Sequence, residues 1–189
     1  EAIRDKAYIY FLKNDYVEAR KYIENISNLK NDDYFGYNIK GLIYLKNNIL
    51  DKAKIYFESA IKINRKYIDS YNNLGVCLLE LEKLNEAHEV FATAYKIDTK
   101  NLKTLINLGN VLSLKDNILE AIKIYKQALN LDSNNQEVLS NISICYCRES
   151  KVKEAKIYYD KAIKINPNDY KLKYAYCTLQ LKLNNFTNS

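Results

Sequence analysis

Residues 68–101 read IDSYNNLGVCLLELEKLNEAHEVFATAYKIDTKN, and the next stretch, residues 102–135, reads LKTLINLGNVLSLKDNILEAIKIYKQALNLDSNN. The two stretches have equal length, and small, aromatic and aliphatic residues fall at matching positions in both. One such position holds alanine at a constant 34-residue interval: Ala19, Ala53, Ala87, Ala121 and Ala155. A fixed period of this length indicates an array of one repeated structural unit.

Two further positions of the repeat pair small residues with large ones. The small residues precede each alanine by twelve positions and are Ala7, Gly41, Gly75, Gly109 and Ser143. The large residues follow each alanine by four positions and are Ile23, Phe57, Phe91, Tyr125 and Tyr159. Two helices approach closely where one side chain is nearly absent and its neighbour fills the gap. We therefore expect tightly packed helix pairs.

Apolar residues within each repeat recur at steps of three and four, which is typical of helices. In residues 68–101 this pattern predicts a helix from about Tyr67 to Glu80 and an antiparallel one from about Leu84 to Ile97. Polar links such as Lys46-Asn47-Asn48 and Lys115-Asp116-Asn117 separate the two helices of a repeat. Asn and Asp tolerate the left-handed backbone that ends many helices.

These columns resemble the tetratricopeptide repeat (TPR), a 34-residue helix-turn-helix unit. The signature positions of that family are matched by Tyr71, Leu74, Gly75, Ala87, Phe91 and Ala94, and by their counterparts one repeat later. The proline that often closes the unit is kept only at Pro167. The resemblance implies an all-α fold, a right-handed superhelical solenoid of antiparallel helix pairs.

In this register a single solenoid contains five repeats, at residues 1–33, 34–67, 68–101, 102–135 and 136–169. Residues 170–189 are then a partial sixth repeat or a cap helix, and Asn184-Asn185-Phe186 resembles the turn between the helices of a repeat. The chain contains no methionine and begins at the second position of a repeat. We therefore expect a fragment of a longer protein.

The formal net charge of +6 comes mostly from lysine, and the groove positions mix both signs. A groove that binds the phosphate backbone of a nucleic acid needs basic residues along its whole length. We therefore expect no nucleic-acid partner. No apolar run approaches the roughly 18 residues needed to cross a bilayer. We expect no membrane insertion and a cytoplasmic location.

The residue types that carry catalysis or bind metals are sparse. His88 is the only histidine, and the sequence has no phosphate-cradling loop and no nucleophile motif. Cys145 and Cys147 would point about 200° apart on a helix, which does not suit a zinc pair. Together with Cys77 and Cys177 they are expected to be buried free thiols. We expect no enzymatic activity, no cofactor and no metal.

The clearest candidate site is a ladder of asparagines, Asn73, Asn107 and Asn141, which recur once per repeat on the first helices. In the TPR family the inward faces of these helices line a concave groove. A side-chain amide offers a donor and an acceptor together, so it can grip a backbone peptide group. The ladder resembles that of superhelical TPR arrays of O-linked sugar transferases. We expect a scaffold that binds an extended peptide segment or partner protein.

Neighbouring groove positions would set the specificity of this site. They are Asn38 and Asn72 in one column, Asn110 one turn along, and the basic residues Lys103, Arg148 and Lys171. The chaperone-binding subclass of the family grips a C-terminal carboxylate with Lys and Asn. Because Ile106 and Ala175 replace polar members of that clamp, this ligand is not expected here.

Two other roles stay open at this point. The chain could be a substrate-recruiting or regulatory arm of a larger enzyme whose catalytic domain lies outside it. It could also be an assembly scaffold that self-associates through exposed array ends. Four aromatic residues near the ends of the chain also allow two interpretations: they either anchor a bound partner or pack against repeats that lie outside this chain. They are Tyr8, Phe11, Phe35 and Tyr174.

Overall fold

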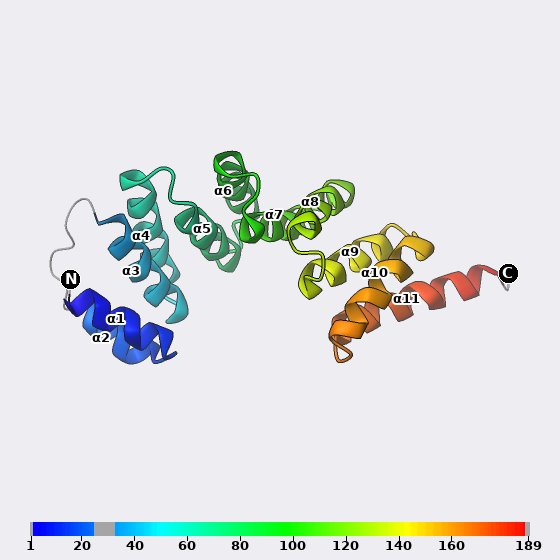
Figure 1. The fold of residues 1–189 in the computed structure, drawn as a ribbon, viewed down its shortest axis with the longest axis horizontal. Coiled ribbons are helices and arrows are strands. Elements are labelled where there is room, and N and C mark those ends of the chain that lie inside the picture. The colour runs from blue at the N-terminus through cyan, green and yellow to red at the C-terminus, as the bar shows by residue number, and fades with distance from the viewer. Residues whose placement is uncertain (1, 25–32, 188–189) are drawn as a thin grey trace. The chain divides into compact units, whose positions relative to one another are not determined.

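The computed structural model describes residues 2–24 and 33–187. Within these ranges all regular secondary structure is α-helical (Figure 1). Contacts between residues divide the chain into two compact units, Glu1–Asp98 and Thr99–Ser189. Each unit is described by itself. The prediction that one continuous array spans both units stays a prediction.

Three helix pairs make up the described part of the first unit. In chain order the helices are α1 (Ala2–Leu12), α2 (Tyr16–Glu24), α3 (Tyr34–Lys46), α4 (Leu50–Ile63), α5 (Ile68–Glu80) and α6 (Leu84–Ile97). Each odd-numbered helix packs on the even-numbered helix that follows it, and α4 also packs on α5. The helices predicted for residues 68–101 are confirmed as α5 and α6.

The second unit repeats the same pairing. Its helices are α7 (Leu102–Leu114), α8 (Ile118–Leu131), α9 (Gln136–Arg148), α10 (Val152–Ile165) and α11 (Tyr170–Thr187). The first helices of successive repeats also touch, since α9 contacts both α7 and α11. Helix α11 runs through Asn184-Asn185-Phe186 without a break, so the turn expected there is wrong.

A turn of constant geometry joins the two helices of each repeat. Its left-handed residue recurs once per repeat, with φ between 57° and 66°, at Asn14, Asn48, Glu82, Asp116 and Ser150. Near Asn48, the amide of Ile49 donates to the carbonyl of Tyr44 at 2.9 Å, the six-residue hydrogen bond that closes a Schellman motif. The left-handed turn expected at Asn48 and Asp116 is confirmed.

The predicted pairing of small and large residues sets how closely the helices approach. A Cβ added to Gly41 would lie 2.6 Å from Cδ1 of Phe57, and one added to Gly75 would lie 2.8 Å from Cδ1 of Phe91. Both distances are shorter than real Cβ contacts. The repeated alanines, Ala19, Ala53, Ala87, Ala121 and Ala155, are all fully buried. The rings can occupy this space only because the facing side chain is absent.

Polar caps start most of the first helices. Asp33, Asn101, Asn135 and Asp169 lie one or two repeats apart, and each accepts a hydrogen bond from a backbone amide in the first turn. Such caps satisfy amides that have no partner inside the helix. Asp169 also accepts bonds from Gln136 at 2.9 Å and Ser140 at 2.8 Å, so it ties α11 to α9.

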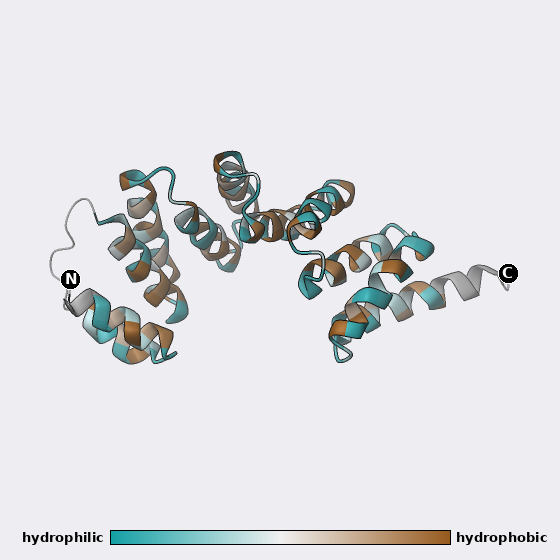
Figure 2. Ribbon diagram, in the orientation of Figure 1, coloured by the Kyte–Doolittle hydropathy of each residue, from teal (hydrophilic) through white to brown (hydrophobic). Residues whose placement is uncertain are grey.

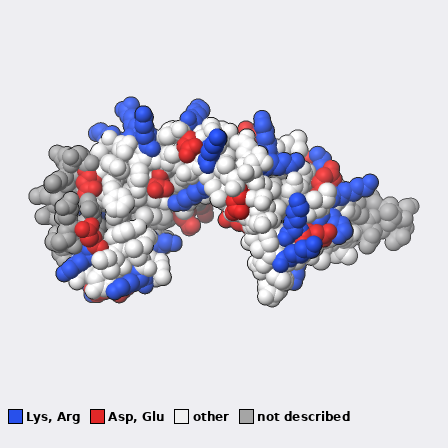
Figure 3. All heavy atoms as spheres, viewed as in Figure 1, with Lys and Arg blue, Asp and Glu red and all other residues white. Residues whose placement is uncertain are grey.

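The surfaces of both units mix apolar, basic and acidic side chains. Along the helices, hydrophobic residues alternate with hydrophilic ones (Figure 2). Lys and Arg are interspersed with Asp and Glu on the face shown in Figure 3. No helix among the described residues is long and apolar enough to span a bilayer.

Candidate functional site

In the first unit, the ladder asparagine takes part in a hydrogen-bond cluster between helices. The amide nitrogen of Asn73 on α5 donates to Oδ1 of Asn38 on α3 at 3.0 Å. The hydroxyl of Ser70 donates to the same oxygen at 3.1 Å. Asn73 is 7% exposed and Asn38 is 3% exposed. The cluster therefore links the first helices of two successive repeats and lies almost entirely inside the protein.

The predicted column of Asn38 and Asn72 is interior. Asn72 is fully buried on α5. The repeat pattern alone indicates which helices carry this column, but not that both side chains are buried. Both side chains can shape a ligand surface only by fixing how helices pack.

In the second unit, a similar cluster is half-buried. The amide nitrogen of Asn141 on α9 donates to Oδ1 of Asn110 on α7 at 2.9 Å, and the Tyr125 hydroxyl on α8 donates to the same oxygen at 2.5 Å. The amide of Asn110 points to Oε1 of Glu137 at 3.4 Å. Two of the predicted site residues, Asn110 and Asn141, are thus brought together by a direct hydrogen bond.

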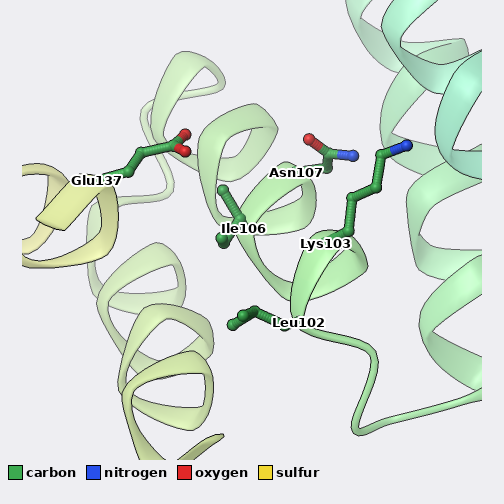
Figure 4. Close-up of a pocket in the computed structure, with 5 residues that line it drawn as sticks. All are labelled: Leu102, Lys103, Ile106, Asn107 and Glu137. Carbon is green, nitrogen blue, oxygen red and sulfur yellow. The ribbon is translucent and has the colours of Figure 1, made fainter. Parts of the chain in front are cut away.

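A hollow of about 370 Å³ lies beside this cluster on α7 and α9. Leu102, Lys103, Ile106 and Asn107 line it from α7, and Glu137 lines it from α9. Figure 4 shows Lys103 and Asn107 on the same side of α7, while Glu137 extends from α9 toward that helix. Asn107 is half-buried, and both Lys103 and Glu137 are exposed. The hollow therefore combines an aliphatic floor, one amide and two opposite charges.

Of the other predicted groove residues, the exposed Arg148 forms bonds to other residues of the protein. Its guanidinium donates to the carbonyl of Ser113 at 2.8 Å and pairs with Asp116 at 2.7 Å. These bonds fasten the end of α9 to the turn after α7. Lys171 is exposed at the start of α11. The structure therefore brings Lys103 and Asn107 into the hollow and leaves Arg148 and Lys171 outside it.

Models of the tetratricopeptide repeat match residues 36–67, 56–89, 102–135 and 136–169. The chain belongs to the tetratricopeptide repeat family. A comparison with curated proteins finds no match. The matched segments include the hollow and the cluster around Asn110, so the candidate site of this TPR chain lies on first helices of recognised repeats.

Solved TPR structures share the fold. YrrB aligns with a TM-score of 0.74 at 20% identity, covering 92% of this chain and 89% of its own. TTC0263 of Thermus thermophilus aligns with a TM-score of 0.72 at 19% identity, covering 95% and 98%. MamA of AMB-1 aligns with a TM-score of 0.77 at 21% identity, covering 88% and 99%. The predicted all-α solenoid of antiparallel TPR helix pairs is confirmed.

The cysteines of this TPR chain differ in exposure. Cys77 and Cys145 are buried as expected, Cys147 is half-buried, and Cys177 is exposed, which corrects the expectation for that residue. Burial raises the pKa of the Cys77 and Cys147 thiols to about 11. These two thiols therefore stay protonated near neutral pH, and the thiolate is the reactive form of cysteine. No group of three or more potential metal ligands occurs among the described residues.

The apolar part of the hollow was missed by sequence reasoning. Leu102 and Ile106 occupy helix positions whose pattern does not distinguish a groove from a repeat interface. A second hollow, of about 540 Å³, was missed because loop residues line part of it. It is bordered by Ser133, Asn134, Leu139, Lys161, Lys164 and Ile165. Only the packing of α9 and α10 brings these residues together.

Proposed function

We propose that this chain is a non-catalytic TPR scaffold that binds an extended segment of a partner protein on the first helices of its second unit. The observation that carries the proposal is the hollow between α7 and α9, which places the Asn107 amide beside an aliphatic floor. An extended peptide presents both a backbone amide group and side chains at short intervals. The hollow offers a complementary partner for each.

Asn107 supplies the polar contact in this proposal. Its half-buried amide carries a donor and an acceptor, so it can pair with the C=O and N–H groups of a peptide backbone. Such a contact is independent of peptide sequence. Leu102 and Ile106 supply the apolar contact, because an aliphatic side chain of the ligand would bury its surface against them.

Asn73 and Asn141, the other predicted rungs, have a different part. Their amide nitrogens donate to Asn38 and Asn110, so a peptide would have to compete with these bonds or use the amide oxygens. We assign them mainly to holding successive first helices at a fixed spacing. Asn107 is the rung that lines the hollow, so the proposed peptide contact is assigned to it.

The solved relatives support a peptide as the ligand class. YrrB, which has the same fold, is described as a TPR protein with an unusual peptide-binding site. At 20% identity the likeness concerns the fold alone, so the residues proposed here come from this chain. The closer resemblance to arrays of O-linked sugar transferases stays a prediction, as do the roles of an enzyme-recruiting arm and of a self-associating scaffold.

Replacing Asn107 by Ala tests the proposal. Peptides that bind the chain are first selected from a library of short synthetic peptides, and their affinities are measured by calorimetry. Asn107→Ala should weaken binding by about 1 to 3 kcal/mol, the cost of leaving buried polar groups unpaired, and the melting transition of the variant is measured alongside. Asn130→Ala is the matched control, since Asn130 is exposed on α8, a second helix. Equal affinity of the two variants would contradict the assignment of Asn107.

A further inference from the structure

Three charged residues occupy one position of the repeat in the second unit. Lys103, Glu137 and Lys171 are each the second residue of a first helix, on α7, α9 and α11, and follow one another at the repeat interval. All three are exposed. Because α9 contacts both α7 and α11, the sign of the charge alternates across three neighbouring helices.

Two of these charges border the proposed peptide site. Lys103 and Glu137 line the hollow with Asn107 and Ile106 (Figure 4). The hydrogen bond from Asn110 to Glu137 holds that carboxylate toward α7. A ligand side chain in the hollow would therefore have a basic group on one side and an acidic group on the other.

Two further basic residues lie on these helices. Arg148 is paired with Asp116, and the Lys173 ammonium lies over the ring of Tyr170 at 5.7 Å from its centre. Neither residue changes the order of signs set by Lys103, Glu137 and Lys171. The order is therefore plus, minus, plus from α7 to α11.

The distance between packed helices predicts the spacing of complementary charges along a bound peptide. Neighbouring helix axes are about 8 to 10 Å apart, and an extended peptide advances about 3.3 Å per residue. One step between first helices therefore corresponds to about three peptide residues. Complementary charges would fall on every third residue of the ligand.

We propose that the second unit selects an extended peptide with acidic, basic and acidic side chains at every third residue, and an apolar residue between the two that meet Lys103 and Glu137. This inference rests on the proposed peptide-binding function and adds its specificity. Uniformly acidic segments would meet repulsion at Glu137, and uniformly basic ones at Lys103 and Lys171. The pattern therefore rejects both kinds of charged chain.

Three synthetic peptides with blocked ends test this pattern. The matched peptide is Gly-Glu-Leu-Ser-Lys-Ser-Leu-Glu-Gly, which carries leucine in both gaps and so serves either chain direction. The reversed peptide exchanges Glu and Lys, and the neutral peptide has Gln at all three charged positions. Affinities are measured by calorimetry with the 189-residue chain at low and high salt.

The matched peptide should bind about tenfold or more tightly than the reversed one at low salt, with the neutral peptide between them. High salt should shrink the difference, because exposed charges are screened. In the triple variant Lys103→Glu, Glu137→Lys, Lys171→Glu the preference should invert, with circular dichroism as the check of folding. Comparing peptides on the unchanged protein keeps the test valid even if this variant unfolds.

The possible failures separate the two proposals. Equal binding of all three peptides at low salt would overturn the charge pattern and leave the peptide groove standing. A preference that persists unchanged in a folded triple variant would also overturn it. Absence of binding by these peptides and by every member of the library would overturn the peptide-binding function itself.

Discussion

The ring of Tyr125 fills the space beside Gly109: a Cβ added to this glycine would lie 2.7 Å from Cδ1 of the ring. Tyr125 is almost completely buried, and its hydroxyl donates to Asn110 at the edge of the candidate site. The same ring therefore closes the helix pair and orients Asn110 beside the proposed peptide site. This contact would connect helix packing with the proposed binding.

Gly109→Ala should destabilise the protein by about 1 to 3 kcal/mol, because the added methyl group overpacks the seam between α7 and α8. The free energy of unfolding in urea measures the effect. In a protein that already carries Tyr125→Leu, the Gly109→Ala substitution should cost less stability than it does in the parent protein. The smaller leucine side chain leaves room for the added methyl group. A neutral Gly109→Ala variant would mean that the seam can open without cost.

Asn38→Ala should cost about 1 to 3 kcal/mol of stability, because Ser70 and Asn73 would both lose a buried acceptor. Urea unfolding again provides the measurement. Asn130→Ala, at an exposed position, should change stability by much less. If the two variants were equally stable, the interior cluster would not contribute to joining α3 and α5.

Glu82→Asn should stabilise the protein by up to about 1 kcal/mol, because Glu82 has φ of 59° in the turn after α5, where a residue with a bulky side chain is disfavoured by about 1 to 2 kcal/mol. Asn14 and Asn48 occupy the same place in earlier repeats. Differential scanning calorimetry would show a higher melting temperature. Glu89→Asn is the control: placed within α6, it should lower stability, because Asn has a weaker helix propensity than Glu.

Stability should fall as the pH rises above the ordinary pKa of a thiol, about 8.5. Burial raises the pKa of Cys77 to about 11 in the folded protein, so the folded state keeps the proton more tightly than the unfolded chain. The contribution of this thiol to the free energy of unfolding is fully present below the pKa of the thiol in the unfolded chain. It is lost as the pH rises toward the pKa of the thiol in the folded protein. Urea unfolding at a series of pH values measures this loss.

Cys77→Val provides the comparison for the alkaline series, because valine occupies the same repeat position at Val111. The variant should lose less stability between neutral and alkaline pH than the parent protein. Cys147, whose pKa is also raised to about 11, should account for part of the remaining loss. Identical pH profiles would show that Cys77 does not titrate in this range.

The asparagine ladder shows how far a repeat pattern can locate a site. The constant repeat interval correctly groups Asn73, Asn107 and Asn141 on equivalent faces of first helices. The surroundings differ, however: Asn73 donates to Asn38, Asn141 donates to Asn110, and a hollow opens beside Asn107 in addition to its contacts within the protein. Asn73 is buried, whereas Asn107 and Asn141 are half-buried, so equivalent positions in sequence have different surroundings.

The sequence by itself determined the repeat length, the helix pairs, the left-handed turns and the columns of small and large residues. These features depend on contacts within one repeat, where periodicity and side-chain size are sufficient information. Only the tertiary structure decided which asparagines are interior, that Arg148 is fastened to Asp116, and where a hollow opens beside Asn107. Those outcomes depend on residues of neighbouring repeats, whose side chains vary from one unit to the next.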